Sequence, residues 1–212
     1  IQSHEGERVV YDPYTFAPQI SSFDLHLFNE GRLYQGYRVL GSHPAQVNGV
    51  IGVRFAVWAP NAERVSVVGE FNRWDGRVNP MSVHGSSGVW ELFLPELTTG
   101  ALYRYEIRNT SGNLLVKIDP YAHEFEVRPG NAARAGAKLS HLWKDTGWLD
   151  KRAKLDWLHA PMNIYEIHAG SWKRHPDGRF YTYRELADQL VPYLQDMAYT
   201  HVELLPVSEH PL

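Results

Sequence analysis

The sequence predicts a mainly β protein, in which an Ig-like β-sandwich is followed by the first strand–helix–strand (βαβ) unit of a parallel α/β domain. Three observations support this fold class. Short segments that alternate apolar and polar residues recur between residues 50 and 119, and Gly-containing turn signals separate them. After residue 162 the pattern changes to a short apolar strand, a helical period and a second apolar strand.

The sandwich is expected at residues 44–128. The first alternating segment, "VRFAVW", places Val53, Phe55 and Val57 on one face, and Pro60 ends it soon afterwards. Further alternating segments are "RVSVVG" (64–69), "VWELFLP" (89–95), "LYRYEIRN" (102–109) and "LLVKID" (114–119). Short strands at this spacing are typical of a sandwich. Residues 1–43 are interpreted as a linker, the tail of an upstream region, with a short helix around "SSFDLHLFNEGRLY".

Residues 129–161 hold three tryptophans without a clean period and are interpreted as a packed linker. In residues 162–212, "NIYEIH" and "THVELLP" are strand candidates on either side of a helix. Thr182 and Glu185 form a T-x-x-E capping box at its start, and Pro192 predicts a kink. The two strands should be parallel. Because a two-stranded parallel sheet needs cover on both faces, we expect the chain to be a fragment whose domain continues beyond Leu212.

Composition argues against several function classes. The chain has 24 acidic and 21 basic residues, a formal charge of -3 and no long basic run, which argues against nucleic acid and anionic membranes as partners. It has no cysteine, and its eleven histidines do not form a ligand motif, so no metal site and no cofactor are expected. Without a signal-like or membrane-spanning segment in the sequence, a cytoplasmic location is expected.

The stretches "GVRFAVWAPNAERVSVVGEFNRWDG", "NIYEIHAGSWKR" and "YRELADQLVPYLQDMAYTHVELLPVSEHP" resemble bacterial glycogen branching enzyme, a 1,4-α-glucan transferase of the α-amylase superfamily. The resemblance covers residues 11–212. It implies a starch-binding-type sandwich before a (β/α)₈ barrel, here truncated, with α-glucan and the remainder of the barrel as partners. It also implies a retaining reaction that uses two carboxyl groups. The motifs that carry these groups have no match here, so no catalytic residue is assigned and the fragment is expected to be inactive.

Trp74, in the turn "FNRWDG", is the first candidate for carbohydrate binding. Sugar C–H faces stack on aromatic rings while hydroxyl groups bond to polar neighbours, which makes Trp74 beside Asn72 a plausible platform. The resemblance to glucan-binding sandwiches adds Arg104 of "LYRY" as the basic helper. The second tryptophan of those sandwiches is absent. The alternative is that Trp74 packs on the sandwich end or on a neighbouring barrel, and packing is the more frequent fate of an aromatic turn residue.

Trp172 is the second candidate, because "AGSWKRHPDGRF" follows the first predicted barrel strand, where the active sites of such barrels lie. The loop "SEHP" after the second strand would share that face, and His168 could line it. Packing of Trp172 is an equal alternative. Glu166 and Glu203, in the middle of strands, are interpreted as members of structural ion pairs rather than as catalytic groups.

Two rival functions remain open. One is a stand-alone glucan-binding module, for which the strand–helix–strand segment would have no use. The other is the matching piece of an isoamylase-like debranching enzyme or a trehalohydrolase.

Overall fold

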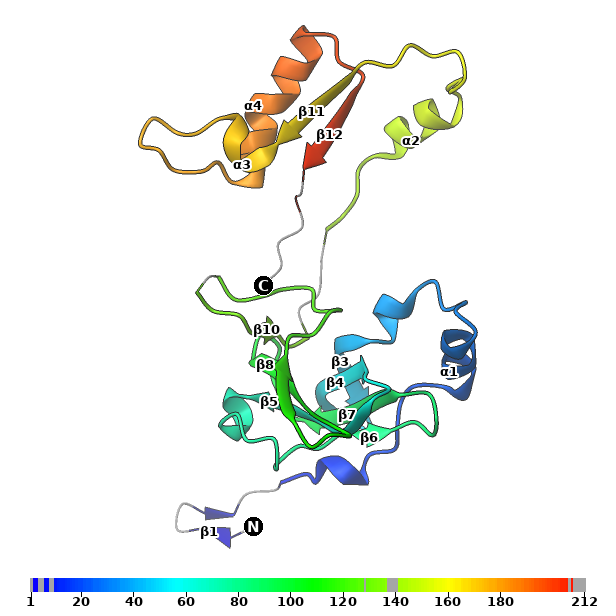
Figure 1. The fold of residues 1–212 in the computed structure, drawn as a ribbon, viewed down its shortest axis with the longest axis vertical. Coiled ribbons are helices and arrows are strands. Elements are labelled where there is room, and N and C mark those ends of the chain that lie inside the picture. Colours follow the sequence, from blue (N-terminus) through cyan, green and yellow to red (C-terminus); the bar gives the residue numbers. More distant parts are fainter. Residues whose placement is uncertain are drawn as a thin grey trace. The chain divides into compact units, whose positions relative to one another are not determined.

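The structure is a computed structural model that describes residues 2–3, 6–7, 10–127, 129–136, 141–205 and 207. The chain divides into two compact units (Figure 1), unit 1 up to residue 140 and unit 2 from residue 141 to 210. Near the start, the two-residue strands β1 (Gln2–Ser3) and β2 (Gly6–Glu7) pair with each other antiparallel. The sequence-predicted limit at residue 128 and the loop at 208–211 lie outside the described residues.

Unit 1 contains two antiparallel sheets, and the predicted β-sandwich is confirmed. The first sheet has the order β3-β4-β7-β6, with β3 at Gly41–Val47, β4 at Val50–Trp58, β7 at Val89–Pro95 and β6 at Ser82–Val83. In the second sheet β8 (Leu102–Asn109) pairs with β5 (Ala62–Gly69), β9 (Leu114–Lys117) and β10 (Ala133–Arg134). Five of these strands coincide closely with the predicted alternating segments.

The main core lies between the two sheets. Val53, Phe55 and Val57 of β4 are buried there, as the period-two alternation predicts, and Phe55 contacts Tyr103 edge-on with ring centroids 4.9 Å apart. The hydroxyl groups of Tyr103 and Tyr105 both donate to the carboxyl group of Asp119. Burial raises the pKa of Asp119, partly offset by these hydrogen bonds. A buried aromatic core thus carries its own polar network.

Within unit 1, residues 10–40 pack against the sandwich, whereas the sequence predicts a tail at 1–43. Helix α1 (Ser22–Asn29) lies between two 3-10 turns, at Pro13–Thr15 and Gly36–Arg38. Ile20 and Leu40 form a second buried cluster with Ala56 and Val89 of the first sheet. The Glu91 carboxylate accepts hydrogen bonds from the backbone N–H groups of residues 19 and 20 at 2.8 and 3.3 Å. The outer face of the first sheet is therefore occupied by the chain itself.

The strands of unit 1 begin and end outside the predicted range 44–128. Strand β3 starts at Gly41 and contains Pro44, which an edge strand tolerates but which hides it from a search for alternation. Strand β10 belongs to the second sheet, although the sequence predicts a linker at 129–161. The tryptophans of that predicted packed linker, Trp143, Trp148 and Trp157, are 73%, 58% and 49% exposed. Packing of these three tryptophans therefore stays a prediction.

Unit 2 contains the predicted strand–helix–strand unit. Strand β11 (Ile164–His168) pairs in parallel with β12 (His201–Leu205), and α4 (Tyr183–Asp196) connects them after the single turn α3 (Ala169–Trp172). The capping box of Thr182 and Glu185 is confirmed, and α4 continues through Pro192. Helix α2 (Thr146–Ala153) precedes this unit. Among the described residues, no helix is long and apolar enough to span a membrane.

Candidate functional site

The turn after β5 has a tightly defined backbone. The 3-10 turn Glu70–Asn72 follows Gly69 and is itself followed by two consecutive residues with positive φ, Arg73 at 57° and Trp74 at 60°. Positive φ is unusual for a bulky residue and persists only where the surroundings impose it. Here the N–H of Trp74 donates to the carbonyl of Gly69 at 2.8 Å. A Cβ atom at residue 69 would lie 2.2 Å from the carbonyl oxygen of Leu102, so glycine is required there.

Asn72 holds this turn together from inside. Its side chain is buried, and its amide donates to the carbonyl of Val67 at 2.9 Å and to Oδ1 of Asn79 at 2.8 Å. Its Oδ1 accepts from the N–H of Gly69 at 2.9 Å. Both amide hydrogens are therefore used within the protein. This differs from the sugar contact predicted for Asn72, because a side chain needed inside the turn cannot also face a ligand.

Trp74 and Arg104 lie together on the outer side of the second sheet. Trp74 is 39% exposed, and the guanidinium carbon of Arg104 lies 5.6 Å from the centroid of its ring. The Trp74 side chain is therefore only partly buried, whereas packing alone would bury it fully. Arg104 is on β8, whose Tyr103 and Tyr105 face the core, so Arg104 points to the opposite face. Its Nε is a buried atom without a hydrogen-bond partner in the described part of the chain.

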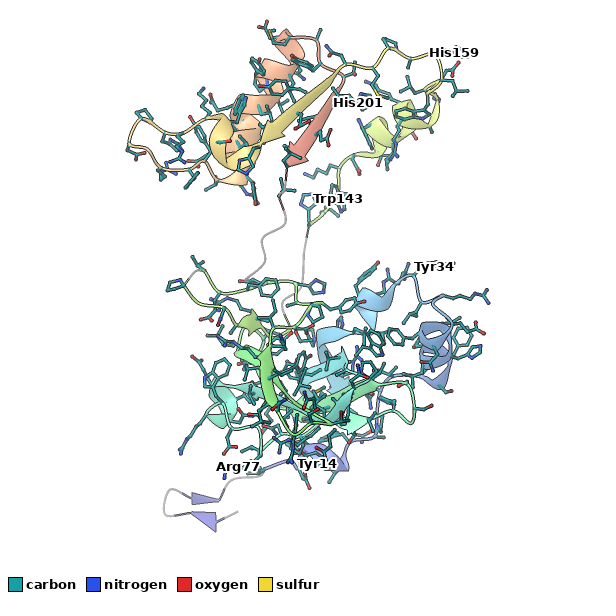
Figure 2. The ribbon with its side chains drawn as sticks, in the orientation of Figure 1. Tyr14, Tyr34, Arg77, Trp143, His159 and His201 are labelled. Carbon is teal, nitrogen blue, oxygen red and sulfur yellow. The ribbon has the colours of Figure 1, made fainter. Side chains whose placement is uncertain are left out.

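The segment that follows the turn is anchored at its far end. The hydroxyl group of Tyr14 donates to the carbonyl of Pro80 at 3.0 Å, and Ser66 of β5 pairs with Pro80 in an isolated antiparallel bridge. Figure 2 shows Tyr14 and Arg77 at the same end of unit 1. The Trp74 turn is thus held between β5 and the N-terminal segment, and its geometry is set before any ligand binds.

A hollow that the sequence reasoning missed lies beside this turn. It measures about 380 Å³ and is lined by the Asp75–Arg77 end of the turn together with charged side chains of β5 and β8. In it, Nη2 of Arg64 lies 2.7 Å from Oε1 of Glu106. In the sequence these two residues look like ordinary outward charges of strands. One feature of the sequence could have indicated this hollow: Glu106 follows Arg104 by two positions on the same strand, so the two side chains share one face of the sheet.

In unit 2, Trp172 uses its polar group within the protein. Its indole N–H donates to the hydroxyl group of Tyr165 at 3.0 Å, and its ring contacts that of Tyr193 edge-on at 5.9 Å. These contacts favour packing, and sugar binding by Trp172 stays a prediction. His168 is exposed and, with Phe180 and Tyr181, lines a hollow of about 640 Å³ at the carboxyl end of β11.

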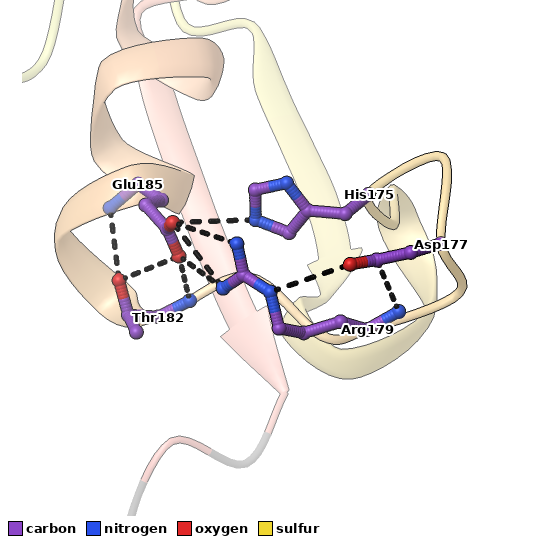
Figure 3. A network of polar contacts seen from close by, with 5 residues as sticks. All are labelled: His175, Asp177, Arg179, Thr182 and Glu185. Carbon is purple, nitrogen blue, oxygen red and sulfur yellow. Dashed lines mark hydrogen bonds and ion pairs between the residues drawn. The ribbon is translucent and has the colours of Figure 1, made fainter.

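The loop after β11 is fixed to the start of α4 by a polar network (Figure 3). Thr182 donates to Glu185 through its N–H at 2.8 Å and its hydroxyl group at 2.9 Å. The carboxylate also lies 3.3 Å from both Nε2 of His175 and Nη1 of Arg179. The hydrogen bonds from Thr182, followed by His175 and Arg179, lower the pKa of Glu185 to about 2. The network is explained by capping of a helix and is exposed, which is typical of a structural role.

The structural ion pairs predicted for Glu166 and Glu203 are not formed with the described residues and stay a prediction. Both side chains are exposed, and the two residues are direct partners across β11 and β12. Neither takes part in an ion pair with the described residues; the ion pairs of unit 2 involve Glu185, Asp177 and Asp156. Among the described residues there is also no group of three or more side chains suited to a metal ion.

Residues 39–122 match the family model for carbohydrate-binding module 48, the isoamylase N-terminal domain. That range includes Asn72, Trp74 and Arg104 and contains most of the sandwich.

The resemblance to glycogen branching enzymes is confirmed by the curated relatives. The chain is 67% identical over 203 residues to the 1,4-alpha-glucan branching enzyme GlgB of Nitrosomonas europaea, which covers 95% of this chain and 28% of that enzyme. It is 54% identical over 210 residues to the GlgB of Cellvibrio japonicus, covering 99% of this chain and 28% of the enzyme. The chain thus spans little more than a quarter of the length of these relatives.

Solved structures agree with this fold. A maltotriose complex of a PulA G680L mutant from Klebsiella pneumoniae matches with a TM-score of 0.56 and 26% identity over 80% of this chain and 20% of that one. A putative alpha amylase from Salmonella typhimurium matches with a TM-score of 0.53 and 22% identity, over 80% of this chain and 25% of that chain. The second likeness concerns the fold alone.

Proposed function

We propose that the chain is part of a bacterial glycogen branching enzyme, which cleaves an α-1,4-glucan and transfers the released chain to a 6-hydroxyl group. The identity of 67% to a branching enzyme over nearly the whole chain supports this assignment. In this proposal β11, α4 and β12 are the first elements of a (β/α)₈ barrel, and the remainder of that barrel is the partner of unit 2. The enzyme acts in the cytoplasm. The chain carries no match to the motifs that hold the catalytic carboxyl groups, so by itself it performs no transfer.

Within unit 1 we assign α-glucan binding to Trp74 and Arg104. The single observation that carries this assignment is the exposed part of the Trp74 ring, held in a strained left-handed conformation with the guanidinium carbon of Arg104 5.6 Å from the ring centroid. The ring offers a plane for the C–H face of a glucose unit, and the guanidinium group offers donors for its hydroxyl groups. Asn72 contributes by shaping the turn.

The test is an NMR titration of the 212-residue chain with maltoheptaose. One stacking ring contributes about 1 kcal/mol, and with a single hydrogen-bonding partner this corresponds to millimolar dissociation. Trp74→Ala should abolish binding, whereas Trp58→Ala should not, although Trp58 is a similarly exposed tryptophan on the first sheet. Melting curves of both variants separate loss of binding from loss of fold. A folded Trp74→Ala variant with the affinity of the wild type would refute the platform.

A debranching enzyme is the second candidate. It is favoured by the description of the matching family model, which names isoamylase, and by the similarity to a Klebsiella pneumoniae pullulanase structure, at 27% identity and a TM-score of 0.54. The complete protein distinguishes the two. A branching enzyme raises the number of α-1,6 linkages in amylose, whereas a debranching enzyme lowers it in glycogen, and counting linkages by proton NMR gives the sign directly.

A further inference from the structure

From the hollow beside the Trp74 turn we infer a second glucan subsite, in which the Arg64–Glu106 pair binds hydroxyl groups of the glucose unit next to the one on Trp74. The inference rests on the proposed function of Trp74 and extends it to named specificity-determining residues.

The hollow lies next to the platform along the chain, although neither Trp74 nor Arg104 lines it. Arg104 and Glu106 are two positions apart on β8 and share its outer face, so their Cα atoms are roughly 7 Å apart along the strand. On the other side, Trp74 leads directly into Asp75 and Gly76, which line the hollow. A chain of sugar rings that leaves Trp74 in this direction therefore enters the hollow. Its volume of about 380 Å³ is within the range of small-ligand sites.

The polar groups of the hollow suit a neutral, hydroxyl-rich ligand. Oε1 of Glu106 accepts from Nη2 of Arg64 at 2.7 Å, while Oε2 receives no hydrogen bond from the described residues. That oxygen is a free charged acceptor for a sugar hydroxyl group, and hydrogen bonds to charged groups are the stronger ones. Both carboxylates that line the hollow are already paired with an arginine, Glu106 with Arg64 and Asp75 with Arg77, so the hollow is not a site of concentrated negative charge for a cation.

The position of the carboxylate depends on Gly76. A Cβ atom at residue 76 would lie 2.0 Å from Oε1 of Glu106, so the carboxylate occupies the space that any other residue would fill. No positive φ explains this glycine, since Gly76 is not among the residues with left-handed backbone. Close approach of the turn to Glu106 is the remaining reason. The turn that presents Trp74 and the carboxylate are therefore fitted to each other.

The alternative is a structural ion pair. Arg64 and Glu106 join neighbouring strands, and their side chains are 33% and 17% exposed, as is common for pairs that merely connect β5 to β8. Such a pair affects stability and leaves ligand affinity unchanged. The two accounts therefore differ in a measurable way.

The experiment titrates the 212-residue chain with maltotriose and follows the indole N–H signal of Trp74 by NMR. Glu106→Gln should weaken maltotriose binding about tenfold, through loss of a charge-assisted hydrogen bond. Gly76→Ala should weaken it as well, because the new methyl group displaces the same carboxylate while every charge is kept. Glu124→Gln is the matched control. Glu124 forms an ion pair with Arg134 at 3.3 Å, and neither residue lines the hollow.

The outcomes separate the two levels of the proposal. If the wild type does not bind maltotriose, the glucan site fails and the second subsite fails with it. If the wild type binds and Trp74→Ala does not, but Glu106→Gln and Gly76→Ala bind as the wild type does, the platform stands and the second subsite is refuted. A shift of the Trp74 signal in the ligand-free variants would show that the turn has moved, and would refute direct recognition by Glu106.

Discussion

Replacing Asn72 by alanine separates a role inside the turn from a role in binding. The side chain is 7% exposed and takes part in three hydrogen bonds, with Gly69, Val67 and Asn79. Alanine leaves these three partners without their bonds in a buried place. Each buried group left unsatisfied costs about 1 kcal/mol or more, which gives a total of roughly 3 kcal/mol.

The loss should appear as a lower unfolding temperature of unit 1. For a unit of this size, about 3 kcal/mol corresponds to a decrease of roughly 10 °C. Because the chain has two units, the melting curve should be followed through amide signals of β4 and β5 rather than through a global probe. Asn131→Ala is a suitable control, because Asn131 is an exposed asparagine, and it should change the temperature by less than about 2 °C.

The structure and the original sequence expectation predict opposite results for Asn72→Ala. A buried structural role predicts a strongly destabilised variant in which glucan binding weakens because the Trp74 turn is no longer fixed. Direct sugar contact predicts unchanged stability with lost maltoheptaose binding. If Asn72→Ala melts as the wild type does and no longer binds maltoheptaose, the structural role of the three Asn72 hydrogen bonds is refuted.

Two further predictions concern unit 2. The pKa of Glu185 is depressed to about 2, so its stabilisation of the start of α4 is complete above the ordinary glutamate pKa near 4.5 and is lost as the pH falls toward 2. The protection factors of the first amides of α4, which are exchange rates corrected for the intrinsic effect of pH, should therefore fall over that window, and an equal fall in Glu185→Gln would contradict this. Glu203→Gln removes the like-charge contact with Glu166 and should stabilise unit 2 by several tenths of a kcal/mol in urea unfolding. The gain should shrink in 1 M salt, and a gain that salt does not change would exclude an electrostatic cause.

Local patterns in the sequence determined most strands and one helix start. Alternation of apolar residues in β4, β5, β7 and β8 follows from the period of two, because one face of each strand must be buried in the sandwich. The capping box of Thr182 and Glu185 likewise depends on residues three positions apart. The resemblance to branching enzymes also needed nothing beyond the chain's own motifs. Such features are local, so the order of residues is enough to predict them.

The tertiary structure decided the features that depend on contacts between distant residues. The Glu91 carboxylate accepts hydrogen bonds from the backbone of residues 19 and 20. The N-terminal segment, predicted as a tail, therefore covers the outer face of the first sheet. No pattern within residues 10–40 specifies that partner.

The same reason governs the candidate site. From the sequence Asn72 and Trp74 look like equal members of a polar–aromatic turn. In the fold the amide of Asn72 is directed inward by Val67 and Asn79, while Trp74 stays half exposed beside Arg104. Glu106 joins the site because β8 brings its outer face under Gly76, 30 residues away along the chain. Which polar group is used inside the protein and which is left for a ligand is settled by packing across strands, because burial decides where an unused hydrogen bond can be tolerated.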